Sequence, residues 1–200
     1  MMRRPTIIAI GGFTSEVGKT TLLCDLLRAF PGWEAIKTTR GHYRSCGKDA
    51  HACCVSHLLT EEPVVRSGRD ATYELGKDTG RYWEAGAVNV HWLIATDEQI
   101  EKGIKQALAR VETAGVFVEG NSFSNFVDAD YFVMVKRSDN EKIKKSAKQV
   151  LSKASAIYLS GEDSSTAAEA ATLSVKVPVY TPSELPALIA QIRKIVAVSV

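Results

Sequence analysis

The stretch Gly12–Thr21 reads GFTSEVGKTT and follows closely on the apolar run Thr6–Ile10. The apolar run has the length and composition of a buried β-strand. After the glycines, Lys19–Phe30 has leucines at positions 22, 23, 26 and 27, which is the spacing of an amphipathic α-helix. Pro31 and Gly32 then end the helix. The sequence therefore predicts a strand, a glycine-rich loop and a helix in immediate succession.

A glycine-rich loop between a strand and a helix is suited to bind phosphate groups. Its backbone N–H groups converge without obstruction by side chains, and the helix presents the positive end of its dipole. Lys19 would bridge the β- and γ-phosphates of a nucleoside triphosphate, and the Thr20 hydroxyl would ligate Mg²⁺. A surface loop that merely opens a helix is the alternative. We expect the nucleotide to contact Gly12, Thr14, Ser15, Glu16, Val17, Gly18, Lys19, Thr20 and Thr21.

Strands and helices alternate along the rest of the chain. The expected strands are Trp33–Thr38, Ala87–Ala95, Val116–Val118, Tyr131–Val135, Ala156–Leu159 and Val177–Tyr180. The expected helices are Asp97–Glu112, Asn140–Ser152, Ser164–Leu173 and Pro182–Val196. This alternation predicts a single α/β domain over residues 1–200, with a doubly wound, mainly parallel sheet covered by helices on both faces. The irregular segment from Thr39 to about Tyr82 is long enough to indicate a functional insertion.

Composition and charge exclude several classes of protein. A hydrophobic content of 45% and a charged content of 24% are typical of a globular protein, and no apolar run suits a membrane span. The net charge of +2 produces no strong electrostatic field that would attract nucleic acid. We therefore expect a cytoplasmic protein with no nucleic-acid or membrane partner. The lysines of residues 142–148 are expected on the exposed face of a helix, and Cys24 in the core.

Charged side chains follow two of the predicted strands, at the sheet edge where open α/β proteins bind ligands. Glu119 directly follows a buried strand and would hold Mg²⁺ together with Thr20. Lys37 and Arg40 follow the second strand and would neutralise a phosphate or an anionic substrate. The alternative for all of them is ordinary solvation at a strand end.

Thiols and imidazoles are concentrated in the irregular segment. They are the ligands that zinc, nickel or copper would take, but their spacing matches no standard zinc finger. A transition-metal site, thiols that line a substrate pocket, and plain structural roles all remain open. The residues are His42, Cys46, His51, Cys53, Cys54 and His57, of which Cys46, His51, Cys53 and Cys54 are the metal-ligand candidates.

The loop is one residue longer than usual, because five residues separate Gly12 from Gly18. Its pattern Gly-x-x-x-Glu-Val-Gly-Lys-Thr resembles the loop of dethiobiotin synthetase and its relatives in the signal-recognition/MinD-type class of P-loop proteins. Lys37 and the sequence Val118–Gly120 also match that enzyme's pattern. The resemblance implies catalysis by Lys19, Lys37 and Glu119, with the acidic residue helping to hold Mg²⁺.

A second resemblance covers Gly76–Ala87, which reads GKDTGRYWEAGA. It is similar to the GKD-x-x-R-x-x-E-A-G-A stretch of molybdopterin-guanine dinucleotide biosynthesis protein B, although the family's usual histidine after Arg81 is a tyrosine here. The two resemblances together imply a P-loop NTPase with a Rossmann-like, three-layer fold. The second one adds Asp78, Arg81 and Glu84 to Lys37 and Arg40 as substrate-site candidates, and it implies a pterin-type substrate, a cofactor-assembly partner protein and a homodimer.

Three functions follow as alternatives. The protein is an NTPase that assists the biosynthesis or delivery of a molybdopterin-type cofactor, a ligase similar to dethiobiotin synthetase that acts on a carboxylate substrate, or a metal-insertion protein whose Cys/His segment carries the metal. The guanine-reading sequence Asn-Lys-x-Asp is absent, so ATP and GTP are both compatible with the sequence.

Overall fold

A computed structural model describes residues 4–43, 55–161 and 176–198. In these ranges eight strands form one sheet in the order β3-β4-β2-β5-β1-β6-β7-β8. Neighbouring strands are parallel, except for the edge pair β3 and β4. The strands are β1 (Thr6–Gly12), β2 (Glu34–Arg40), β3 (Val64–Ser67), β4 (Val90–Ala95), β5 (Gly115–Glu119), β6 (Tyr131–Arg137), β7 (Ala156–Ser160) and β8 (Val179–Tyr180).

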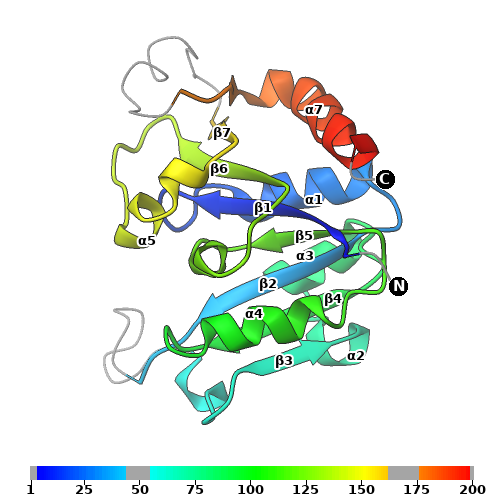
Figure 1. Cartoon of the computed structure of the whole chain (residues 1–200), viewed down its shortest axis with the longest axis vertical. Coiled ribbons are helices and arrows are strands. Elements are labelled where there is room, and N and C mark those ends of the chain that lie inside the picture. The colour runs from blue at the N-terminus through cyan, green and yellow to red at the C-terminus, as the bar shows by residue number, and fades with distance from the viewer. Residues whose placement is uncertain (1–3, 44–54, 162–175, 199–200) are drawn as a thin grey trace.

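Helices cover both faces of this sheet, with α4 in front of it and α1 and α3 behind it in Figure 1. The central strand β1 shows why, because its side chains alternate between two apolar cores. Ile8 and Ile10 pack with α1 and α7, whereas Ile7 and Ala9 pack with α4. The helices are α1 (Lys19–Ala29), α2 (Arg69–Thr72), α3 (Asp78–Glu84), α4 (Ile100–Leu108), α5 (Lys145–Lys148) and α7 (Leu185–Val198).

This architecture confirms the predicted α/β fold with a doubly wound, mainly parallel sheet. The segment from Thr39 to Tyr82 is less irregular than expected, because it contains β3, α2 and most of α3. β3 adds the antiparallel edge strand that the sequence did not predict. Cys24 is buried in the core as expected, and this burial raises its pKa to about 11.

Two predicted helices are shorter than expected, for local reasons. α4 ends at Leu108, and the backbone N–H of Glu112 donates to the buried Glu34 carboxylate at 2.8 Å instead of continuing the helix. Before α5, the Asn140 side chain accepts a bond from the backbone of Lys142, as in an Asx turn. The predicted helix Ser164–Leu173 lies outside the described residues.

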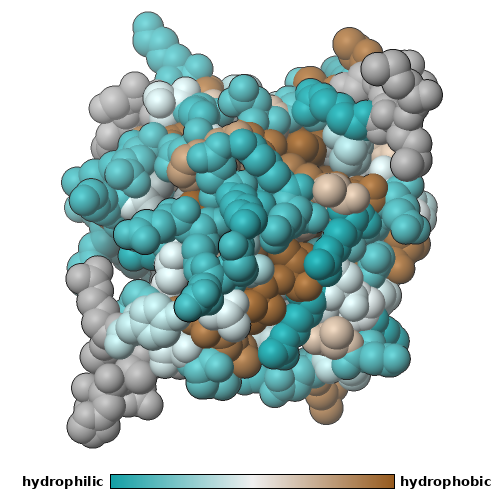
Figure 2. Space-filling view, turned by 60° about the horizontal axis from the view of Figure 1, so that its bottom comes forward, coloured by the Kyte–Doolittle hydropathy of each residue, from teal (hydrophilic) through white to brown (hydrophobic). Residues whose placement is uncertain are grey.

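No helix in the described ranges is both long enough and apolar enough to cross a membrane. Seen from the side of β3 and α2, the surface is largely hydrophilic, and hydrophobic side chains show mainly in a band between the polar ones (Figure 2). Val65, Leu108 and Val111 are partly buried and pack against the core on the α4 face. Hydrophobic atoms at such a surface are normal for a globular protein.

Candidate active site

The loop between β1 and α1 is fastened at both of its ends. Asn121 accepts a bond from the Gly12 backbone N–H at 2.8 Å and donates to the Gly12 carbonyl at 2.9 Å. The Phe13 N–H donates to the Val135 carbonyl on β6. At the other end, the Ser160 hydroxyl donates to the Val17 carbonyl at 2.8 Å. These hydrogen bonds within the protein fix the shape of the loop.

The backbone within the loop turns the start of α1 toward the cleft. Gly18 has a φ of 87° and precedes the first residue of α1, and Glu16 has a φ of 60°. No side chain caps α1, and its first turn contains no acidic residue. The first turn of α1 therefore carries no acidic side chain of its own beside its backbone N–H groups. The Lys19 ammonium crosses the loop and donates to the Thr14 carbonyl at 3.3 Å.

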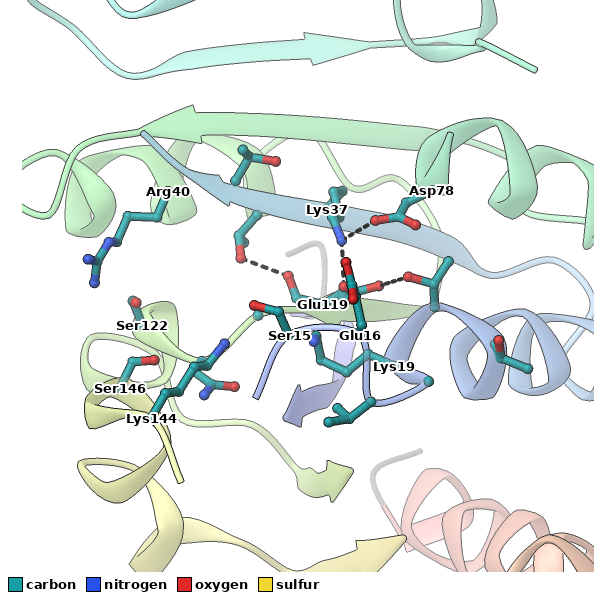
Figure 3. A pocket seen from close by; sticks show the side chains of 18 of the residues that line it. Ser15, Glu16, Lys19, Lys37, Arg40, Asp78, Glu119, Ser122, Lys144 and Ser146 are labelled. Atoms are coloured by element: carbon teal, nitrogen blue, oxygen red, sulfur yellow. Dashed lines mark hydrogen bonds and ion pairs between the residues drawn. The ribbon is translucent and has the colours of Figure 1, made fainter. Parts of the chain in front are cut away.

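A cleft of about 840 Å³ opens at this loop (Figure 3). It lies at the carboxyl ends of β2 and β5 beside the start of α1, which is the edge where open α/β sheets bind ligands. Its lining combines residues of the loop, the end of β2, α3, the segment after β5 and the start of α5. The cleft is large enough for a nucleotide.

Glu119 is the centre of the polar network at the bottom of the cleft. Its side chain is 2% exposed. Thr20 donates its hydroxyl to Oε2 at 2.9 Å, Tyr82 donates its phenol to the same oxygen, and the Lys37 ammonium lies 2.5 Å from Oε1. Burial raises the pKa of Tyr82 well above its usual value, and the Glu119 carboxylate raises it further, so the phenol stays a proton donor.

Lys37 joins Glu119 to a second carboxylate. Its ammonium lies 2.6 Å from Asp78 Oδ2 as well as 2.5 Å from Glu119 (Figure 3). Burial lowers the pKa of Lys37, but the two carboxylates outweigh it and raise the pKa above its usual value. Burial has the opposite effect on Asp78, and there the Lys37 charge and hydrogen bonds prevail and lower the pKa. Lys37 is thus charged and Asp78 ionised at neutral pH.

Gly120 allows the chain to leave β5 at Glu119. Its φ is 147°, and a Cβ at this position would lie 1.8 Å from the Thr38 hydroxyl. That hydroxyl donates to the Glu119 carbonyl at 2.7 Å. The absence of a side chain at Gly120 therefore lets β2 fix the backbone that carries the central carboxylate.

The structure brings most of the predicted site residues to the same cleft. Lys37 and Arg40 lie within β2 and not after it, and Arg81 donates to the Thr21 hydroxyl at 3.2 Å. Glu84 is exposed and accepts a bond from the Tyr73 hydroxyl outside the cleft lining. The predicted nucleotide contacts Gly12 and Thr14 are also outside the lining. The predicted residues that line the cleft are Ser15, Glu16, Val17, Gly18, Lys19, Thr20, Thr21, Lys37, Arg40, Asp78, Arg81 and Glu119.

Sequence reasoning did not assign three residues of the site. Tyr82 follows Asp78 by four positions, so helical spacing could have placed both on one face of α3. Asn121 directly follows the Val118–Gly120 sequence, but its bonds to Gly12 join segments 109 residues apart. Lys144 was expected on an exposed helix face, whereas it lines the cleft.

The transition-metal candidates Cys46, His51, Cys53 and Cys54 lie outside the described residues. Within the ranges that the structure describes, no three or more His, Cys, Asp or Glu side chains are grouped so as to hold a metal ion.

The similarity of this chain to known proteins is found in its structure and not in its sequence. No model of a known protein family matches the sequence, and neither does any curated protein. The solved structure of the "apo" form of LpxK from Aquifex aeolicus in complex with ATP superposes with a TM-score of 0.49 and 14% sequence identity. The match covers 88% of this chain and 53% of that one, so this chain spans about half the length of LpxK.

Proposed function

We propose that this protein binds a nucleoside triphosphate, ATP or GTP, together with Mg²⁺, and transfers or hydrolyses the γ-phosphoryl group. The observation that carries this proposal is the convergence of Lys19, Thr20, Lys37 and Glu119 at the start of α1. A lysine directly after a glycine-rich loop, an uncapped helix end and a buried carboxylate form the combination that nucleotide phosphates and their metal need.

The donor set supports a Mg²⁺ site. The Thr20 hydroxyl lies 2.9 Å from Glu119 Oε2, and Asp78 is joined to the same network through Lys37. Hydroxyl and carboxylate oxygens are the hard ligands that Mg²⁺ prefers, and the metal usually completes its shell with water and phosphate oxygens. Thr20 would hold the ion, with Glu119 and Asp78 as carboxylate partners. Bound there, Mg²⁺ would neutralise charge on the transferred phosphoryl group.

The chain's own cations would supply the rest of the charge neutralisation. Burial lowers the pKa of Lys19, and repulsion by Lys37 lowers it further. Phosphate oxygens at the loop would relieve this penalty by giving the Lys19 ammonium an anionic partner in place of the Thr14 carbonyl. In the transfer step the bond between the γ-phosphorus and the bridging oxygen breaks, and a bond from water or an acceptor oxygen forms. Lys19 and Lys37 would stabilise the negative charge on the phosphoryl oxygens while one bond breaks and the other forms.

The finer proposal is a role in the biosynthesis or delivery of a molybdopterin-type cofactor. It depends on the Gly76–Ala87 resemblance, and its structural support is that Asp78 and Arg81 of this stretch line the same cleft as the loop. A pterin-type substrate, an assembly partner and a homodimer belong to this proposal. A rate of nucleotide hydrolysis that depends on added pterin would support it, and an unchanged rate would count against it.

Lys37 favours the ligase alternative. In a protein similar to dethiobiotin synthetase, Lys37 would neutralise a phosphate or the carboxylate substrate. Here it lines the cleft with its ammonium between Glu119 and Asp78, so a substrate carboxylate would have to displace one of these two groups. Detection of a phosphorylated or cyclised product from a diamino carboxylic acid separates this alternative from cofactor delivery.

The metal-insertion alternative depends on the Cys/His segment alone. Metal analysis of the purified protein tests it, with a Cys46→Ser/Cys53→Ser variant as the comparison. The idea is abandoned if the parent protein carries no stoichiometric transition metal and binds none tightly.

Calorimetric titration with ATP and GTP in the presence of Mg²⁺ tests the main proposal. We expect Lys19→Ala to weaken nucleotide binding by about 30-fold or more, because it removes a charge-assisted contact to phosphate. Lys77→Ala is the matched control, since Lys77 is exposed and lies outside the cleft lining. Absence of binding to either nucleotide, or equal binding by Lys19→Ala, contradicts the proposal.

A further inference from the structure

The cleft extends beyond the loop into a second lobe of about 410 Å³. This lobe lies between the start of α4, the segment from Ser122 to Phe126, and α5. It shares several lining residues with the main cleft, Arg40, Ser122, Lys145 and Ser146 among them. In Figure 3 Arg40, Ser122, Lys144 and Ser146 lie on one side of the cleft, and Lys37 and Asp78 lie on the other. The second lobe is therefore on the opposite side of the loop from the expected Mg²⁺ site.

Cationic side chains gather around the junction of the two lobes, and the acidic Asp97 lines the second lobe with them. In the described ranges, the Lys144 ammonium has neither an ion pair nor a hydrogen bond. Burial lowers the pKa of Lys144 to about 8, and repulsion by Lys19 and Arg40 adds to the effect and outweighs the attraction of Glu119. Arg40 has one carboxylate partner, with its Nε 3.2 Å from the exposed Asp97. A half-buried, unpaired ammonium next to other cations favours an anionic ligand.

The backbone fixes Lys144 at this position. Its N–H donates to the carbonyl of Phe13, the second residue of the GFTSEVGKTT stretch, at 2.9 Å. Lys144 is thus attached to the phosphate loop itself, and it extends toward Ser15 in Figure 3. An anion bound by Lys144 would therefore lie close to the transferred phosphoryl group.

We infer that Arg40, Lys144 and Lys145 form an anion subsite that binds a negatively charged group of the phosphoryl acceptor. The hydroxyls of Ser122 and Ser146 line the same region and would add hydrogen bonds to the anion. The inference rests on the proposed phosphoryl transfer and names the acceptor's chemical class, a small molecule with a carboxylate or a phosphate group. The subsite would orient that acceptor on the side of the phosphoryl group away from the metal-binding carboxylates.

The test uses protein made with ¹³C-labelled lysine and saturated with Mg²⁺ and the β,γ-imido analogue of the nucleotide that it binds. Inorganic phosphate is titrated while the Lys144 side-chain resonance, assigned with Lys144→Arg, is followed by NMR. We expect a saturable shift, and we expect Arg40→Gln to weaken phosphate binding by about tenfold, as for the loss of one charge-assisted contact. Lys148→Gln should leave it within about twofold, because Lys148 is exposed on α5 and lines neither lobe.

A parallel titration with acetate separates the two sources of the anion. Tighter binding of acetate indicates a carboxylate acceptor, and tighter binding of phosphate indicates a phosphate ester; both support the subsite. The inference is overturned if neither anion shifts the Lys144 resonance of the analogue-saturated protein. It is likewise overturned if phosphate shifts that resonance only when the analogue is left out, because Lys144 would then contact the nucleotide's own phosphates. It is also overturned if Arg40→Gln and Lys148→Gln behave alike. If the analogue itself does not bind, the proposed function fails, and the acceptor role fails with it.

Discussion

Lys37 on β2 and Glu119 on β5 are register partners in the sheet, and the Lys37 ammonium lies 2.5 Å from the Glu119 carboxylate. The same ammonium lies 2.6 Å from Asp78, so a single cation neutralises two carboxylates. A metal ion that binds these carboxylates has to compete with Lys37. The Lys37–Glu119 pair therefore affects both the stability of the protein and the binding of a metal ion at the site.

Replacement of Lys37 by methionine should lower the free energy of unfolding by about 3 kcal/mol, because it leaves the Glu119 carboxylate buried without its cation. The double variant Lys37→Met/Glu119→Gln should recover most of this loss. Urea unfolding without Mg²⁺ or nucleotide measures both variants, and Lys142→Met at an exposed position is the control. Additive effects of the two substitutions would show that the pair is not coupled.

Asn121→Ala should loosen the start of the phosphate loop. It leaves the buried N–H and carbonyl of Gly12 without their partners, which costs about 2 to 3 kcal/mol, and we expect nucleotide affinity to fall roughly tenfold. Thermal unfolding and nucleotide titration measure the two effects. Asn125→Ala is the control for stability, because Asn125 is exposed in the following turn. Unchanged stability of Asn121→Ala would contradict the anchoring role.

Gly120→Ala should be far more damaging than Gly32→Ala. Both glycines have positive φ, but a Cβ at Gly120 would lie 1.8 Å from the Thr38 hydroxyl, whereas a Cβ at Gly32 meets nothing within 4 Å. We expect a loss of about 1 kcal/mol for Gly32→Ala from backbone strain alone and of about 3 kcal/mol or more for Gly120→Ala. Equal losses in denaturant unfolding would mean that the contact with Thr38 is relieved without disturbing β2.

Acid should destabilise the protein through Glu34. Its carboxylate lies 2.6 Å from His91 and accepts bonds from the backbone of Glu112 and Thr113. Burial raises the pKa of Glu34, but these bonds outweigh it and lower the pKa below its usual 4.5. The stabilisation is therefore complete above pH 4.5 and is lost as the pH falls through the lower folded-state pKa.

The comparison with Glu34→Gln measures this contribution. The variant should be less stable than the parent by about 2 kcal/mol near neutral pH, and the difference should shrink as the pH is lowered toward about 3. Urea unfolding at a series of pH values gives both curves. If the stabilities of the parent and the variant change in parallel with pH, protonation of Glu34 is not linked to unfolding.

The part of the site that the sequence could predict is the part made by neighbouring residues. The strand, loop and helix from Thr6 to Ala29 follow from local hydrophobic spacing and glycine chemistry, and the structure confirms them. Glu119 was expected beside Thr20 because strand ends meet at one sheet edge, and its carboxylate does accept the Thr20 hydroxyl bond.

The rest of the site depends on contacts between distant segments. Tyr82 reaches Glu119 only because α3 packs against α1. No local sequence pattern predicts this packing. Lys144 lies in a lysine-rich stretch that is typical of an exposed helix, and its bond to Phe13 directs it into the cleft. β3 is four residues long and its hydrophobic pattern is too short to distinguish from a loop, so the antiparallel edge was not predicted.

The loop between β1 and α1 is made early in synthesis but is anchored by residues made late. Asn121 holds Gly12 across 109 positions, and Ser160 holds Val17 across 143. While the chain emerges from the ribosome, the loop lacks its Asn121 anchor until the segment after β5 has left the exit tunnel, and it lacks its Ser160 anchor until β7 has followed. The loop therefore reaches its final shape only when β7 has been added to the sheet.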